Sequence, residues 1–164
     1  MKIYIFENYR EFFPERKGRG LTDTLIKKAL ESENLGQGEI VRDERGKPFI
    51  KGREALFISA SHSGEYFVCA ISDAPVGIDV QEEREGRLSR ISKRYFSAEE
   101  QAYVKERGEA GFFSLWTRKE AYAKYTGRGL EEIMKGTSVL GREDVDFVDF
   151  QIEKGIYCSC CVKR

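Results

Sequence analysis

The chain has 164 residues, which suits one domain or two small fused half-domains, and 40% of them are hydrophobic, enough for a packed core. Lys and Arg together number 28, as do Asp and Glu, so the net charge is zero and a general nucleic-acid binder, which carries a basic excess, is disfavoured. No apolar run approaches the roughly 20 residues that span a bilayer, and the start of the chain lacks the apolar stretch of a signal peptide, so we expect a cytoplasmic protein.

The first part of the chain predicts strands around one helix. Residues 1–7 alternate like a strand, residues 21–33 carry apolar side chains at helical spacing, and residues 42–52 predict a loop or hairpin end around Gly46-Lys47-Pro48. A tight polar turn, Ser61-His62-Ser63-Gly64, is expected to separate two further strands. The strands predicted in this part and just after it cover residues 56–60, 66–72 and 76–81.

Helical signals dominate the second part. Ser97 and Glu100 have the spacing of a capping box, which predicts a helix through about Glu106. Residues 112–125 predict a second helix, ended by Gly127 and Gly129. The tail returns to strands over residues 146–152 and 156–163. This order of elements favours an α+β fold over a regular βαβ alternation.

Two segments of the chain resemble each other weakly. Gly64–Ile71 and Gly155–Val162 share a glycine, a tyrosine and one cysteine at matching positions, which hints at a duplicated architecture. The second segment holds three of the four cysteines. A metal cluster is one interpretation, but the spacing differs from that of a CxxC knuckle. We therefore interpret these cysteines as small hydrophobic residues of a terminal strand.

Asp79 lies in an otherwise apolar strand, Val76–Val80. A carboxylate there costs stability unless it is paired or binds a metal. Strand alternation places Asp79 and Gln81 on one face. The alternative interpretation is an aspartate at the end of a strand that caps the next turn.

A second constellation lies on the helix predicted over residues 112–125. Trp116, Glu120 and Lys124 share a face at helical spacing, with Lys119 beside them. Two ammonium groups beside a carboxylate can hold phosphates around a divalent ion, although Glu120 and Lys124 alone could also form an ordinary surface pair. Imidazole and hydroxyl groups in the predicted turn around His62 could likewise bind a phosphate.

Five short motifs occur in a characteristic order. They are Gly46-Lys47-Pro48, Ser61-His62-Ser63-Gly64, Gly77-Ile78-Asp79-Val80, Arg94-Tyr95-Phe96-Ser97 and Trp116-Thr117-Arg118-Lys119-Glu120-Ala121. Their order and spacing resemble the 4′-phosphopantetheinyl transferase superfamily, specifically its single-chain, surfactin-synthetase-activating type. Lys124 and Gly127-Arg128-Gly129-Leu130 extend the resemblance, which covers over half of the chain.

The resemblance implies a fold and a reaction. It implies a single domain with two similar, pseudo-two-fold related α+β halves, about 1–72 and 73–164, each a small antiparallel sheet packed against a long helix. The implied reaction is magnesium-dependent: 4′-phosphopantetheine passes from coenzyme A to a serine of an apo acyl- or peptidyl-carrier protein, and adenosine 3′,5′-bisphosphate is released. The two-half arrangement favours a monomer, with no nucleic acid or membrane as partner.

Residue roles follow from the same resemblance, motif by motif. The metal ligands would be Asp79 and Glu120, with Glu120 also the base. Gln81, which stands where the family often has a second acid, could still ligate through its amide oxygen. The implied cofactor contacts are Lys47, Ser61 and His62 at the 3′-phosphate, Lys119 and Lys124 at the pyrophosphate, and Arg19, or nearly as well Lys17, at a further phosphate.

Two alternatives to this reaction stay open. One is a catalytically weak module that binds coenzyme A or a carrier protein without transferring anything, and Gln81 is its support. The other is a coenzyme A-dependent acyltransferase.

Overall fold

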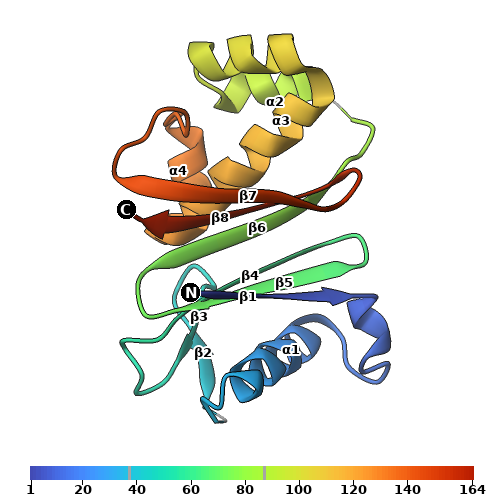
Figure 1. The fold of residues 1–164 in the computed structure, drawn as a ribbon, viewed down its shortest axis with the longest axis vertical. Helices are drawn as coiled ribbons and strands as arrows, with labels where there is room; N and C mark the ends of the chain where they lie inside the picture. Colours follow the sequence, from blue (N-terminus) through green and yellow to red (C-terminus); the bar gives the residue numbers. More distant parts are fainter. Residues whose placement is uncertain (37, 87) are drawn as a thin grey trace.

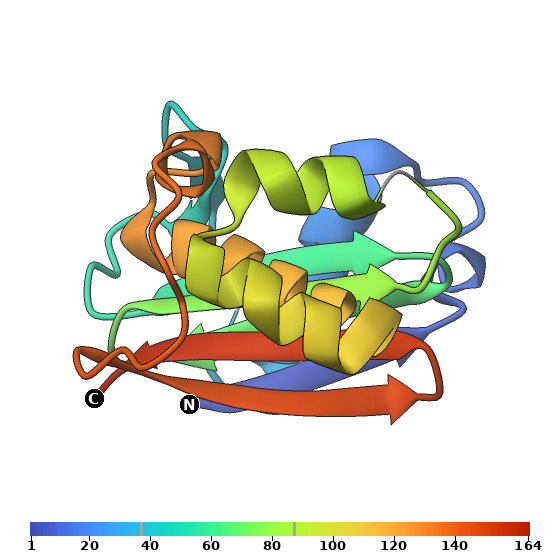
Figure 2. The ribbon, with the colours of Figure 1, turned by 90° about the horizontal axis from the view of Figure 1, so that it is seen from above.

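The structure is a computed structural model that describes residues 1–36, 38–86 and 88–164. It contains two antiparallel sheets, one of five and one of three strands, together with helices, which confirms the expected α+β fold class. Figure 1 shows the larger sheet and α1 in the lower part of the molecule and the smaller sheet with α2, α3 and α4 in the upper part. Viewed from above, the helices gather on one side of the strands (Figure 2).

The five-stranded sheet has the order β1-β5-β4-β3-β2. Helix α1 (Gly18–Ser32) follows the short 3-10 helix η1 (Tyr9–Glu11) and packs on this sheet through the predicted apolar face, whose residues are all buried. The helix begins three residues earlier than the sequence pattern indicated. The strands are β1 (Lys2–Glu7), β2 (Ile40–Arg42), β3 (Pro48–Ile50), β4 (Phe57–Ser63) and β5 (Tyr66–Ser72).

The prediction of a polar turn over Ser61-His62-Ser63-Gly64 was wrong in its first three residues. Strand β4 continues through Ser63, which pairs with Tyr66 of β5. The reversal occurs at Gly64, whose φ of 55° lies in the left-handed region that suits glycine. Serines occur at these positions of β4 because they hydrogen-bond to a strand of the other sheet, and not because the chain turns there.

The three-stranded sheet has the order β6-β8-β7 and confirms the strands expected near the end of the chain. Helix α3 is capped as predicted by Ser97 and Glu100, and Gly127 ends it with a φ of 70°. The two helices expected over this region form one element with a break at Gly108. The sequence reading missed two short helices, α2 and α4. The bounds are β6 (Val76–Glu82), α2 (Leu88–Tyr95), α3 (Ala98–Thr126), α4 (Leu130–Met134), β7 (Val145–Glu153) and β8 (Ile156–Lys163).

The two segments that echo each other in sequence are both interior strands of their sheets. β5 lies between β1 and β4, and β8 lies between β6 and β7. Each follows a glycine with positive φ, Gly64 or Gly155. All four cysteines are free and buried, and the three of β8 confirm their interpretation as small hydrophobic residues of a terminal strand. The last strand of the first sheet ends at Ser72, and the first strand of the second sheet begins at Val76. The division of the chain into two equivalent halves stays a prediction.

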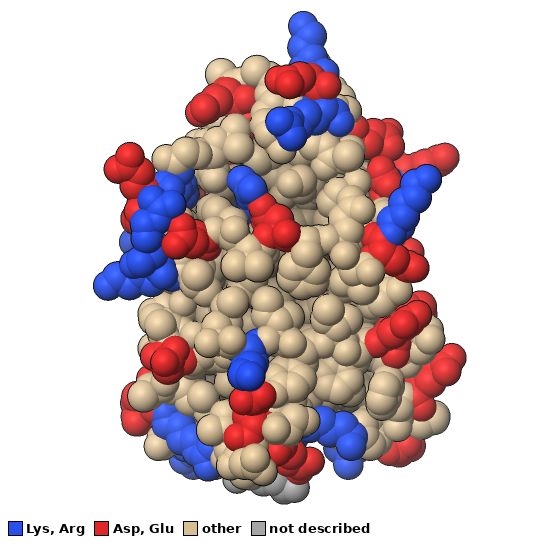
Figure 3. Space-filling model, in the orientation of Figure 1, with Lys and Arg blue, Asp and Glu red and all other residues tan. Residues whose placement is uncertain are grey.

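The surface carries charges of both signs. Figure 3 shows Lys, Arg, Asp and Glu mixed around the rim of one face, with a largely neutral centre. Ile5 of β1 and Val148 of β7 are each 44% exposed. Among the described helices, none combines the length and apolar character needed to cross a membrane.

Candidate active site

Strands β4 and β6 lie side by side at a seam between the two sheets, and serine side chains join them. Ser59 Oγ accepts a hydrogen bond from Ile78 N at 3.0 Å, and Ser63 Oγ accepts one from Glu82 N at 3.0 Å. Both serines are buried. Because both pairs have the same separation along the chain, the strands keep a fixed register. Ser61, which lies between the two serines, is thereby close enough to donate a hydrogen bond to the Asp79 carboxylate.

Helix α3 lies directly on β6 because residue 77 is glycine. A Cβ atom at Gly77 would come within 2.0 Å of the Ala121 carbonyl oxygen and 2.3 Å of Tyr125 N. The absence of a side chain lets the helix approach the strand closely. Glu120 and Lys124, which lie on this part of the helix, are thereby brought over Asp79.

Asp79 is 2% exposed, and its carboxylate is surrounded by donors. Oδ1 accepts hydrogen bonds from Ser61 Oγ at 2.6 Å and from Lys124 Nζ at 2.7 Å. Oδ2 accepts one from Gln81 Nε2 at 2.8 Å. The buried carboxylate is therefore paired with a cation and hydrogen-bonded on both oxygens, as its burial requires.

Glu120 is the second carboxylate of this group. The pKa of Glu120 is raised to about 7, mainly by burial and also by the negative charge of Asp79, while the positive charge of Lys124 opposes the shift. Within the described part of the chain, no hydrogen-bond donor reaches the Glu120 carboxylate. Asp79, Glu120 and Lys124 are together called the carboxylate cluster below.

A basic groove of about 790 Å³ opens beside this seam, between η1, the start of α1 and β4. A smaller pocket continues it toward the seam and brings Arg19, Ser61 and His62 together, next to Gly46. Two of the three residues assigned to the 3′-phosphate, Ser61 and His62, therefore line one surface, together with Arg19, which was assigned to a further phosphate. The basic groove is defined by Arg10, Arg16, Lys17, Arg19 and His62.

His62 lies on the exposed side of β4, with its ring 5.8 Å from that of Tyr9. Partial burial lowers the pKa of His62, and the positive charges of Lys124 and Arg10 lower it further. Both effects favour the neutral form of the imidazole.

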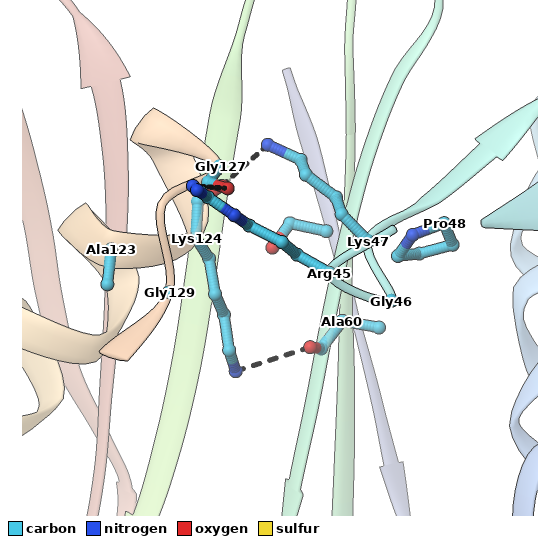
Figure 4. A pocket seen from close by; sticks show the side chains of 10 residues that line it. Arg45, Gly46, Lys47, Pro48, Ala60, Ala123, Lys124, Gly127 and Gly129 are labelled. Atoms are coloured by element: carbon cyan, nitrogen blue, oxygen red, sulfur yellow. Dashed lines mark hydrogen bonds between the residues drawn. The ribbon is translucent and has the colours of Figure 1, made fainter. Parts of the chain in front are cut away.

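Lys47 lies apart from these groove residues. Its ammonium donates to the carbonyl oxygens of Val76 at 3.1 Å and Lys124 at 2.6 Å, and burial lowers the pKa of Lys47. Arg45 in the same hairpin donates to the Gly127 carbonyl oxygen at 3.2 Å. Figure 4 shows both side chains reaching from the hairpin to the end of α3. These cations neutralise the carbonyl end of the helix, a role that the sequence analysis did not identify.

The structure does not bring Lys119 into the carboxylate cluster, contrary to the expectation. Lys119 is 2% exposed, pairs with the buried Glu100 at 2.9 Å and donates to the Thr137 carbonyl oxygen at 2.6 Å. The break at Gly108 explains this placement, because it folds the first part of α3 back so that Glu100 meets Lys119.

The flanking serines Ser59 and Ser63 were also missed. Their signal in the sequence is the alternation Ser59-x-Ser61-x-Ser63, which places all three hydroxyls on one face of a strand. Because the sequence analysis predicted a turn here, it did not identify this alternation as that of a strand.

Comparisons with known proteins point to one family. The 4′-phosphopantetheinyl transferase psf-1 of Bacillus pumilus is 44% identical over 89 residues, covering 52% of this chain and 38% of that protein. The 4′-phosphopantetheinyl transferase gsp of Aneurinibacillus migulanus is 31% identical over 160 residues, covering 86% and 66%. For Sfp of Bacillus subtilis strain 168 the identity is 31% over 131 residues, covering 76% and 58%.

The chain thus spans less than two thirds of the length of these relatives. The model of the 4′-phosphopantetheinyl transferase superfamily matches residues 75–156, half of the chain, and this segment contains both carboxylates, Lys124 and the glycine that seats α3 on β6. With this match and the relatives in agreement, the chain belongs to the 4′-phosphopantetheinyl transferase superfamily.

Proposed function

We propose that this protein transfers the 4′-phosphopantetheine group of coenzyme A to a serine of an apo acyl- or peptidyl-carrier protein and releases adenosine 3′,5′-bisphosphate. The observation that carries the proposal is the meeting of a basic groove with two carboxylates at one seam. A groove lined by cations suits the phosphates of coenzyme A, while paired carboxylates suit a divalent cation and a proton acceptor.

Mg²⁺ is proposed as the cation of this site. Among the described residues, no group of three or more His, Cys, Asp and Glu side chains could hold a metal ion by itself. Asp79 and Glu120 still fit Mg²⁺, which commonly takes one or two carboxylates and completes its shell with substrate phosphates and water. Gln81 would add its amide oxygen if the amide turned. When bound, Mg²⁺ would neutralise charge on the pyrophosphate of coenzyme A.

Glu120 is proposed as the general base. Without a metal ion its pKa is about 7, so its burial makes it a stronger base than an ordinary glutamate. Glu120 would take the proton of the carrier serine as the serine oxygen bonds to the β-phosphate. The bond from that phosphorus to the adenosine 3′,5′-bisphosphate then breaks, and the leaving group carries away the electron pair.

The cations of the chain are proposed to orient coenzyme A. Ser61 and His62 would hold the 3′-phosphate and Arg19 a further phosphate, and the pocket that all three line beside the carboxylate cluster supports this assignment. Lys124 would contact the pyrophosphate. Lys47 would act indirectly, because its hydrogen bond to the Lys124 carbonyl oxygen fixes the end of α3 that carries Lys124.

We further propose that the chain acts as a cytoplasmic monomer whose two halves, 1–72 and 73–164, form a single domain. The seam supports this organisation, because buried serines of one half satisfy backbone amides of the other. Light scattering during size-exclusion chromatography tests the monomer directly, and a dimer mass would contradict it.

Mass spectrometry of an apo-carrier protein, after incubation with acetyl-coenzyme A, Mg²⁺ and this protein, tests the proposed reaction. A gain of acetyl-phosphopantetheine on the carrier serine is expected. A gain of acetyl alone would indicate an acyltransferase. No change in mass, despite measurable binding of coenzyme A, would indicate a binding module.

A further inference from the structure

Three donors hydrogen-bond to the Asp79 carboxylate, and they differ in whether they could also bind a cation. The Ser61 hydroxyl can rotate and offer its oxygen lone pairs instead of its proton. The Gln81 amide can turn and present its oxygen. The Lys124 ammonium carries only donors and a full positive charge, so it cannot become a ligand to a cation.

Lys124 therefore occupies one of the two Asp79 oxygens that a metal ion would use. Its Nζ is 2.7 Å from Asp79 Oδ1, and the Asp79 side chain is only 3% exposed. Two cations this close to one buried carboxylate oxygen would repel each other strongly. The lysine has to withdraw from Asp79 before a metal ion can approach the same oxygen.

We infer that Lys124 acts as the counter-cation of Asp79 and weakens metal binding to the carboxylate cluster when coenzyme A is absent. When coenzyme A binds, its phosphates become the new partner of Lys124, and the carboxylate becomes available to the metal ion. The inference rests on the proposed function. It adds an order of events: the metal and the phosphorylated substrate bind the cluster cooperatively, and Lys124 couples them.

A second hydrogen-bond acceptor for the Lys124 ammonium lies next to Asp79. The ammonium also donates to the Ala60 carbonyl oxygen at 3.3 Å, as Figure 4 shows. Ala60 lines both the pocket around Lys124 and the pocket that contains Ser61 and His62. The Lys124 side chain is 28% exposed, so it is not locked into its pair with Asp79. A phosphate at the seam would thus lie within a rotamer change of the lysine.

Lys119, on the same helix, is a lysine whose ion pair is fully buried. It is 2% exposed, and its partner Glu100 is fully buried. Because the two lysines differ in this way, only Lys124 is suited to exchange partners during binding.

Binding of Mn²⁺, a paramagnetic substitute for Mg²⁺, tests the inference without any catalytic turnover. Free Mn²⁺ is measured by electron paramagnetic resonance at pH 8, with and without saturating coenzyme A, and a protein-free titration corrects for Mn²⁺ bound to coenzyme A in solution. Wild type should bind Mn²⁺ weakly alone and at least about tenfold more tightly with coenzyme A, within the usual range of coupling between sites.

Lys124→Met should bind Mn²⁺ alone about tenfold or more tighter than wild type does and should lose most of the coupling to coenzyme A. Lys105→Met, which removes an exposed lysine elsewhere on α3, is the matched control and should behave as wild type. Asp79→Asn in the Lys124→Met background should abolish the gain. The melting temperature with and without Mn²⁺ gives a second measure, and Lys124→Gln replaces Lys124→Met if that variant does not fold.

Equal Mn²⁺ affinity for wild type and Lys124→Met without coenzyme A would overturn the inference. If coenzyme A still binds and the carrier is still modified, the proposed function survives that result. Failure of every variant to bind either Mn²⁺ or coenzyme A would overturn the proposed function as well.

Discussion

The basic groove and the carboxylate cluster lie on opposite sides of one seam, yet they are built differently. The groove draws on several Arg and Lys side chains near the start of the chain, including Arg10 and Arg16, which are about half exposed, together with His62 of β4. In the cluster, by contrast, Asp79 is buried and each of its oxygens has fixed partners. Phosphate affinity can thus be shared among interchangeable cations, whereas metal binding and proton transfer depend on single side chains.

The largest expected effect lies in the cluster. Glu120→Gln should lower the rate of transfer by about 100-fold or more, because it removes the proposed base and a metal ligand together. The change is isosteric, so circular dichroism and melting should show an intact fold. Glu109→Gln, an exposed position on the same helix, is the control. Near-normal turnover in Glu120→Gln would remove this residue from the mechanism.

A groove residue should instead affect affinity, and selectively. His62→Ala should weaken binding of coenzyme A about tenfold or more but leave 3′-dephospho-coenzyme A nearly unaffected, since a hydrogen bond to a charged group contributes about 1.5–3 kcal/mol. Titration calorimetry with both ligands measures this difference. Equal losses for the two ligands would place His62 away from the 3′-phosphate.

Lys47→Ala tests whether a cation at the seam contributes to stability as well as to binding of coenzyme A. Because the Lys47 ammonium binds two backbone carbonyls at the seam, its loss should lower the melting temperature by several degrees as well as weaken coenzyme A. A selective loss of 3′-phosphate binding with unchanged stability would restore the role that the family resemblance implied.

Glu120 also predicts how stability of the metal-free protein depends on pH. Its folded-state pKa of about 7 exceeds the ordinary value of 4.5, so the folded state holds the proton more tightly than the unfolded state does. Stability should therefore fall as pH rises from about 4.5 to 7, by roughly 1–3 kcal/mol after allowance for partial solvent contact. Urea titrations of wild type and Glu120→Gln over this range should diverge, with the variant the more stable at pH 8. Parallel curves would contradict the raised pKa.

The sequence anticipated the cluster better than the groove or the seam, for physical reasons. Asp79 stood out because a charge inside an apolar strand needs a partner, and Glu120 and Lys124 share a helical face. The serines of β4 were mistaken for a turn, because polar residues in a strand look alike whether they face solvent or a neighbouring strand.

Lys119 shows a second limit of sequence analysis. Helical spacing placed it beside Glu120, but its ammonium is held by Glu100, nineteen residues away in the chain. That contact depends on the backbone at Gly108, with φ of 65° and ψ of −148°, and a single glycine does not reveal how sharply it will bend a helix. The short helices α2 and α4 carry too few turns to show a clear period.

The smallest expected effect concerns Gln81, which touches the cluster without carrying charge. Gln81→Glu replaces the donor that now bonds Asp79 Oδ2 at 2.8 Å by a second carboxylate. Half-maximal activity should then require about three- to tenfold less Mg²⁺, because the added charge attracts the cation, while the maximal rate changes little. Without Mg²⁺ the variant should be less stable, since two neighbouring carboxylates repel each other. Gln151→Glu adds the same charge on the exposed surface of β7 and controls for a general electrostatic effect. Superimposable Mg²⁺ titrations of wild type and Gln81→Glu would show that this side chain only orients Asp79, and would leave Asp79 and Glu120 as the metal ligands that this chain supplies.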